Sequence, residues 1–203
     1  MEFRPLAIGG AWEITLARFG DPRGEFMEVF KEAAFAEATG RPLTIRQVNT
    51  SVSAAGVARG IHFAQIPPSQ SKYVFCPKGA VVDYVIDIRV GSPTFGQWDS
   101  VTLDDTDRRA IFLSEGLGHM FVSLEDGSTV TYLCSAPYAP GREFGVHPQC
   151  ATIGIDFPTT DRAGAPLELL LSQKDTAAPG LLRAQEQGIL PTYEEQQAFL
   201  RAL

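Results

Sequence analysis

Cysteine is scarce in this sequence of 203 residues. The three cysteines, Cys76, Cys134 and Cys150, are odd in number and form no CxxC pair. We therefore expect neither a disulfide framework nor a zinc knuckle, both of which need paired cysteines. The cysteines are interpreted as small core residues of a protein from a reducing compartment, so we expect a cytoplasmic location.

Positive charge and long hydrophobic runs are also lacking. The chain has 17 Lys and Arg against 24 Asp and Glu, a formal net charge of −7, whereas nucleic-acid binders usually present a basic face. No segment is as long and apolar as a membrane span, and the N-terminal stretch MEFRPLAIGGAWEI is too polar for a signal peptide. We therefore expect neither a nucleic acid nor a membrane as a partner.

The sequence does contain a series of short apolar segments separated by Gly, Pro and Asp. Its length is that of one domain, so we assign residues 1–203 to a single domain with residues 179–203 as a helical tail. Segments this short and evenly spaced indicate an all-β sandwich or closed barrel rather than a parallel sheet with crossover helices. The predicted strands cover residues 12–16, 25–30, 46–53, 57–63, 71–76, 80–88, 97–103, 110–113, 120–123, 129–135 and 152–155.

The segment VVDYVIDI shows the strand pattern most clearly. Val81, Asp83 and Val85 alternate with Tyr84 and Ile86, which places the two sets on opposite faces. This period indicates a strand rather than a helix.

Helix is predicted in three places only. Residues 31–39 (KEAAFAEAT) end at Gly40, a residue suited to the position after a helix. Residues 179–187 begin with proline, which favours the first turn of a short helix. Thr192 and Glu195 match a capping box for a last helix that runs to the C-terminus.

Histidine occurs only at His62, His119 and His147. His62 lies in RGIHF and His119 in EGLGHMF, and small cupin-type barrels carry histidines at two such places. A metal-binding cupin needs an HxH pair in the first motif, but Ala64 stands two residues after His62, which leaves too few ligands for zinc or iron. We therefore expect no metal. His62 is then free for proton chemistry, although a single strand histidine equally fits an ordinary hydrogen-bonded polar residue.

Longer motifs occur in a fixed order along the chain. They are DPRGEF at 21–26, QVNTS at 47–51, RGIHF at 59–63, PPSQSK at 67–72, DIRVGSPTFG at 87–96, EGLGH at 115–119, GIDFP at 154–158 and LSQKD at 171–175. Each motif alone is weak, but the ordered set is highly specific. From about Arg4 to Leu182 the chain resembles the dTDP-4-dehydrorhamnose 3,5-epimerase family, including its relatives that make deoxysugars for antibiotics.

The resemblance implies a cupin-like jelly-roll barrel that works without a cofactor, as a homodimer whose N-terminal strands cross to the partner. The implied substrate is a dTDP-4-keto-6-deoxyhexose, from which a proton next to the C4 ketone is removed and then returned from the opposite face. Such a reaction needs a base, an acid and a group that stabilises the enolate. His62 matches the base, Asp175 its carboxylate partner, Tyr132 the acid and Lys72 the cation near the enolate oxygen. Taken singly, Tyr132 also fits a core residue and Asp175 a helix N-terminal or loop residue.

The resemblance also places residues around the nucleotide and the sugar. Arg23, Arg59 and Lys72 match the positive charge that a diphosphate requires, and His119 matches a residue at the sugar. Taken alone, Arg23 fits an ordinary turn residue equally well. Tyr138 is a candidate for stacking on thymine. The remaining substrate-binding positions are Phe26, Glu28, Gln47, Asn49 and Glu143.

Three departures from the family pattern bear on specificity. Met120 follows the barrel histidine where the family usually has a small residue, and a methionine beside the sugar would reshape which carbon faces the base. Residues 159–165 form an insertion, and the family's Trp near residues 145–148 is absent. The tail after Leu182 is like that of antibiotic-pathway members.

We therefore predict an epimerase that inverts C3, with or without C5, in deoxysugar biosynthesis for an antibiotic. The enzymatic alternatives are a full 3,5-epimerase that makes dTDP-4-dehydrorhamnose and a keto-isomerase that acts on the same substrate. A sugar-binding cupin without turnover is the non-enzymatic alternative. A metal-dependent oxygenase is a further alternative and would contain stoichiometric iron.

Overall fold

The computed structural model describes every residue of the chain. Its helices are α1 (Glu32–Thr39), α2 (Gln173–Thr176), α3 (Leu181–Glu186) and α4 (Tyr193–Arg201), and none is long and apolar enough to cross a membrane. Its strands are β1 (Glu2–Pro5), β2 (Ala11–Thr15), β3 (Ala17–Asp21), β4 (Gly24–Glu28), β5 (Gln47–Ser53), β6 (Ala58–Ala64), β7 (Lys72–Lys78), β8 (Ala80–Ile86), β9 (Trp98–Asp104), β10 (Arg109–Leu113), β11 (Gly118–Ser123), β12 (Ser128–Cys134) and β13 (Glu143–Gly145).

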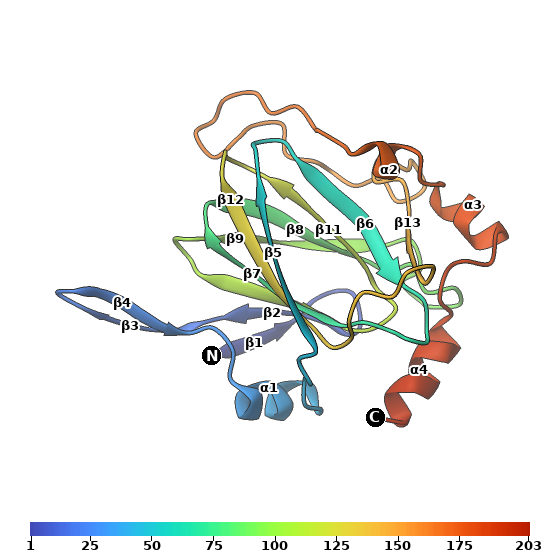
Figure 1. Ribbon diagram of the computed structural model, residues 1–203, viewed down its shortest axis with the longest axis horizontal. Helices are drawn as coiled ribbons and strands as arrows, with labels where there is room; N and C mark the ends of the chain where they lie inside the picture. Colours follow the sequence, from blue (N-terminus) through green and yellow to red (C-terminus); the bar gives the residue numbers. More distant parts are fainter.

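Most strands belong to two facing sheets, which form the body of the molecule (Figure 1). One sheet has six strands in the order β1-β2-β10-β7-β12-β5, and the other has five in the order β13-β6-β11-β8-β9. All pairs are antiparallel, and the chain passes repeatedly from one sheet to the other, as in a jelly roll. The prediction of an all-β, cupin-like jelly-roll barrel is confirmed.

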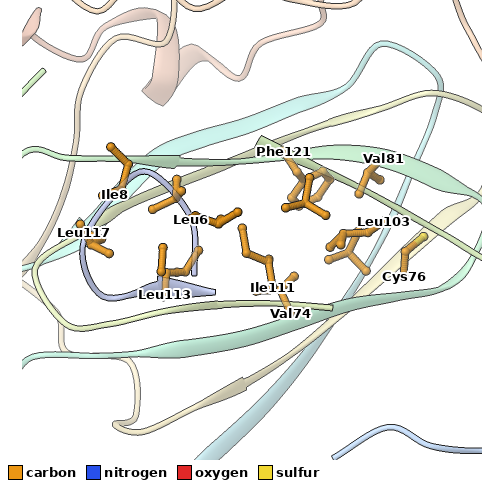
Figure 2. Packing of buried hydrophobic residues seen from close by; sticks show 14 residues of the cluster. Leu6, Ile8, Val74, Cys76, Val81, Leu103, Ile111, Leu113, Leu117 and Phe121 are labelled. Atoms are coloured by element: carbon orange, nitrogen blue, oxygen red, sulfur yellow. The ribbon is translucent and has the colours of Figure 1, made fainter. Parts of the chain in front are cut away.

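The space between the sheets holds a hydrophobic core of 14 buried residues. Figure 2 shows Val81 and Phe121 entering this core from one side and Ile111 from the other. Val81 and Val85 of β8 lie in the core, whereas Ile86 belongs to a second cluster on the outer face of the five-stranded sheet. The predicted alternation of this strand is therefore confirmed.

The outer faces of both sheets are covered by other parts of the chain. Leu181 and Leu190 from the C-terminal region are buried against the five-stranded sheet, and Phe35 of α1 is buried against the six-stranded sheet. The predicted helix signals are confirmed: Gly40 ends α1 with a left-handed φ of 78°, and Thr192 begins α4 with the expected capping box.

Residues 152–155 are a turn rather than the predicted strand. The N–H groups of Ile153 and Gly154 donate to the Cys150 carbonyl, while Ile153 and Ile155 are buried in the outer cluster. The alternating apolar pattern thus reflects a docked loop, not pairing in a sheet. No prediction covers β1, β3 and β13, because the first two are short and mostly exposed and the third has only three residues.

β3 and β4 form a separate hairpin that projects from the body (Figure 1). The rings of Phe19 and Phe26 lie 6.2 Å apart on this hairpin and are 58% and 67% exposed. An isolated two-stranded hairpin is at best marginally stable in water. The core of this chain does not cover the aromatic surface of the hairpin.

Gly60 allows β6 to pass close to β11. Its φ is +127°, and a Cβ at this position would lie 2.4 Å from the carbonyl oxygen of His119. Gly60→Ala is therefore expected to lower the free energy of unfolding by more than about 2 kcal/mol, measured by urea denaturation. Gly9→Ala is the control, because nothing lies within 4 Å of a Cβ there. Equal unfolding midpoints for Gly60→Ala and the wild type would contradict this role of the glycine.

Candidate active site

A cavity of about 480 Å³ is lined by residues of both sheets. Arg59, His62 and His119 come from the five-stranded sheet, and Lys72 and Tyr132 from the six-stranded sheet. Because the sheets face each other, the His62 imidazole and the Tyr132 phenol reach the cavity from opposite sheets. This is the arrangement that removal and return of a proton from opposite faces requires.

Strand register brings these side chains together. His62 on β6 and His119 on β11 are directly paired, so their side chains are neighbours on one face. Tyr132 on β12 pairs with Val74 on β7, whose side chain lies in the core between the sheets. Lys72 stands two residues before Val74 and therefore points to the same face.

The imidazole of His62 is held by a carboxylate from outside the sheets. Asp175 Oδ1 lies 2.7 Å from His62 Nε2, and Asp175 is 4% exposed. Burial alone would raise the pKa of Asp175, but hydrogen bonds from His62 and Ser172 outweigh it and lower the pKa below its usual value. Asp175 is therefore ionised at neutral pH, so it accepts a hydrogen bond from the Nε2–H of His62. This leaves the lone pair on Nδ1, which makes Nδ1 the basic atom.

Lys72 and Tyr132 are neighbours on the opposite sheet, where Lys72 Nζ lies 5.9 Å from the centroid of the Tyr132 ring. Burial lowers the pKa of Lys72, and the nearby carboxylates of Glu143 and Asp83 partly offset this effect. Burial raises the pKa of Tyr132. At neutral pH the phenol therefore keeps its proton and can donate it. No carboxylate of the chain forms a salt bridge with the Lys72 side chain.

A second histidine–carboxylate pair lies deeper in the barrel. His119 Nε2 lies 3.0 and 2.9 Å from the two oxygens of Asp83, which is fully buried on β8. Burial raises the pKa of Asp83, while His119 and Lys72 lower it. No group of three or more His, Cys, Asp or Glu side chains comes together as a metal site.

Comparison of the chain with known proteins agrees with this geometry. A family model described as dTDP-4-dehydrorhamnose 3,5-epimerase matches residues 5–183. The chain belongs to this family. It is an isomerase, an epimerase of dTDP-4-keto-6-deoxyhexoses.

Three relatives illustrate the range of the family. The dTDP-4-dehydrorhamnose 3,5-epimerase of Mycolicibacterium smegmatis is 57% identical over 203 residues, which cover 100% of this chain and 97% of the relative. The Mycobacterium tuberculosis rmlC epimerase structure has a TM-score of 0.94 at 50% identity and covers 100% and 99% of the two chains. The structure of ChmJ, a 3'-monoepimerase from Streptomyces bikiniensis in complex with dTDP-quinovose, has a TM-score of 0.91 at 43% identity and covers 98% and 97%.

The remaining predicted binding residues of the epimerase lie around the cavity rather than in its wall. Gln47 Nε2 donates to Asn49 Oδ1 at 2.8 Å, and Gln47 Oε1 accepts from the N–H of Tyr138 at 3.0 Å, so these three residues form one group at β5. The Tyr138 side chain is 59% exposed and free to stack on a ligand. Glu143 lines a neighbouring cavity of about 290 Å³, which shares Asp175 with the first.

The structure does not bring the three hairpin residues of the epimerase to this cavity. Arg23 pairs with Asp21 at the hairpin tip and its side chain is 89% exposed. Phe26 is exposed on β4, and Glu28 pairs with Lys31 at 3.2 Å. Within one chain these residues are therefore separate from the other predicted binding residues.

Met120 is not placed beside the sugar, contrary to the sequence-based hypothesis. It is fully buried in the cluster on the outer face of the five-stranded sheet, whereas its neighbours His119 and Phe121 line the cavity. The reason is the strand period, which turns successive side chains to opposite faces. Met120 therefore does not line the cavity, whereas His119 and Phe121 of the same motif do.

Four further polar residues of the site were not predicted. Ser51, Ser172 and Lys174 line the cavity, and Asp83 holds His119. The sequence does contain a signal for Asp83, because a carboxylate among valines on the inward face of a strand must have a buried partner. Ser172 and Lys174 stand within the LSQKD motif beside Asp175. For Ser51 the sequence contains no signal beyond its place in the QVNTS motif.

The pH profile of the epimerase tests the state of Lys72. Because its pKa is lowered, kcat/KM is expected to fall at a pH below that at which an exposed lysine loses its proton. Asp83→Asn removes a negative charge that raises this pKa, so the alkaline limb should move to still lower pH. Asp107→Asn changes an exposed acid outside the cavity and should leave the limb in place. An unmoved limb in Asp83→Asn would contradict the coupling.

Proposed function

We propose that this epimerase inverts C3 of a dTDP-4-keto-6-deoxyhexose, with or without C5, through an enolate and without a cofactor. One observation carries the proposal: His62, Tyr132 and Lys72 line a single cavity and come from facing sheets. An enolisation with inversion needs a base and an acid on opposite faces of the carbon and a cation at the oxygen.

The proton steps balance within the chain and solvent. His62 Nδ1 removes the proton from C3, and the C–H electron pair becomes the double bond of the enolate as charge moves to the C4 oxygen. The Lys72 ammonium stabilises that charge, and Asp175 stabilises the imidazolium. Tyr132 then donates its proton to the opposite face of C3, which restores the ketone with inverted configuration. The imidazolium returns its proton to solvent, and water reprotonates the tyrosinate.

The diphosphate and nucleoside are assigned to residues around the cavity. Arg59 lines the cavity and has no carboxylate partner, since its Nε donates only to Ser53 at 3.2 Å. Gln47, Asn49, Tyr138 and Glu143 are assigned to the nucleotide and sugar. The dTDP-quinovose bound by the ChmJ relative supports a dTDP-hexose as the substrate class.

We further propose a homodimer in which the β3–β4 hairpin completes the partner's site. Two apolar surfaces favour it: Phe19 and Phe26 on the hairpin, and Val48 and Val52, which are 55% and 64% exposed on β5. β5 is also one of the two edge strands of the six-stranded sheet, an arrangement that favours association with another chain. In this dimer Arg23, Phe26 and Glu28 reach the nucleotide of the partner.

Mixed dimers test this exchange of hairpins. Arg23→Ala alone should raise KM roughly tenfold through loss of a charge-assisted hydrogen bond. Co-expression of Arg23→Ala and His62→Asn chains should yield mixed dimers with the KM of the wild type. One site of each mixed dimer then has an intact His62 and an intact hairpin from the partner. If each hairpin served its own chain, co-expression would restore nothing.

Epimerisation of both C3 and C5 is the second candidate, and the 57% identity to a 3,5-epimerase favours it. The antibiotic pathway remains a prediction from the sequence motifs. NMR of the product from dTDP-4-keto-6-deoxyglucose separates the possibilities. One inverted centre indicates a 3-epimerase, two indicate a 3,5-epimerase, and a ketone moved from C4 indicates a keto-isomerase. Binding without any change of the sugar would indicate a sugar-binding cupin.

A further inference from the structure

Ser172 makes two contacts with the carboxylate partner of the base. Its Oγ donates to Asp175 Oδ2 at 2.8 Å and accepts from the Asp175 N–H at 3.1 Å. The first contact fixes the oxygen that does not face His62, and the second begins the single turn α2 that carries Asp175. One hydroxyl therefore sets both the backbone and the carboxylate plane of Asp175.

The carboxylate has few other restraints. Oδ1 accepts from His62 Nε2, and Ser172 is the only other side chain that forms a hydrogen bond with the carboxylate. α2 has only four residues, so no longer helix holds it in place. Without the Ser172 hydroxyl, rotation about the Cβ–Cγ bond of Asp175 would present Oδ2 and Oδ1 to His62 in changing geometry.

We infer that Ser172 is a positioning residue of the epimerase, whose hydroxyl orients Asp175 and so keeps the proton of neutral His62 on Nε2 and the lone pair on Nδ1. This inference rests on the proposed function for its consequence in catalysis. The predicted tautomer of His62 does not depend on the proposed function, because it is a property of the protein without substrate. Neutral imidazole that carries its proton on Nδ1 has no basic atom toward the substrate, so loss of the orientation reduces the active fraction.

The test separates orientation from simple helix capping. Ser172→Gly keeps most of the capping preference but removes the hydroxyl, whereas Ser172→Thr keeps both. Ser172→Gly is expected to lose roughly 10- to 30-fold in kcat with little change in KM, and Ser172→Thr should recover most of it. Thr192→Gly, which removes the cap of α4 outside the cavity, should leave kcat unchanged.

Nitrogen-15 NMR of the histidine side chains measures the tautomer of His62, which loss of the helix cap alone does not change. The chain has only three histidines, so the signals of His62 can be assigned. The wild type and Ser172→Thr should show neutral His62 with its proton on Nε2, and Ser172→Gly should show a mixture of tautomers. Wild-type kcat and an unchanged tautomer in Ser172→Gly would overturn the inference. Full turnover in His62→Asn, by contrast, would overturn the proposed function. The NMR comparison of the Ser172 variants would still test whether Ser172 sets the tautomer of His62.

Discussion

The His62→Asn variant is expected to lose at least about 10³-fold in kcat, together with exchange of the substrate's C3 proton with solvent. Asparagine is neutral, fits the site of the imidazole and can still donate to Asp175, so the fold and the cavity should persist. It cannot accept a proton from carbon at neutral pH, because an amide nitrogen has no basic lone pair. Proton NMR in D₂O follows both losses in one sample.

His147→Asn is the matched control for this variant. His147 is the remaining histidine that lines neither cavity, and its Nδ1 accepts from the Gln149 N–H at 3.1 Å. Its replacement should leave kcat and exchange within about twofold of the wild type. Substantial exchange in His62→Asn would assign the base to another group.

Tyr132→Phe is expected to reduce inversion by about 10²- to 10⁴-fold while exchange of the substrate proton continues. The phenyl ring preserves the packing against the core and the contact with Lys72, but no proton donor remains on that face. His62 can still remove the proton and return one from solvent to the same face. The variant should therefore convert an epimerase into an enzyme that mainly exchanges protons.

Tyr138→Phe removes the same hydroxyl from a tyrosine at the nucleotide end and provides the comparison. Its ring keeps the surface for stacking, so kcat should stay close to that of the wild type. The ratio of exchange to inversion, measured by NMR with each variant, is the informative quantity. If Tyr132→Phe lost exchange and inversion equally, the phenol could not be the acid of the opposite face.

Much of the fold follows from local patterns in the sequence. The alternation around Asp83 gives the correct faces of β8, and the Gly40 and Thr192 signals give the correct helix ends, because each rule acts over a few residues. The 152–155 segment fails for the opposite reason. Its isoleucines are buried by distant parts of the chain, and burial alone produces a strand-like pattern in a loop.

In the site, too, local motifs identify residues but do not predict contacts between distant parts of the chain. His62, Lys72, Tyr132 and Asp175 could be selected from motifs, but the motifs do not reveal that Asp175 reaches β6 from a single helical turn 113 residues away. The position of Met120 was predictable from the strand period, since His119 and a residue next to it cannot share a face. The hairpin residues lie away from the cavity within one chain, and a pattern within one chain cannot position them against the proposed partner.

The most direct test of the central claim is a single incubation of the wild-type protein with dTDP-4-keto-6-deoxyglucose in D₂O. The account predicts that every inverted carbon next to the C4 ketone carries deuterium from solvent, at C3 or at both C3 and C5, because a different group delivers the new proton. NMR of the product reads configuration and deuterium content at each carbon together. An inverted carbon that retained the substrate's own hydrogen would contradict proton exchange between two opposed groups.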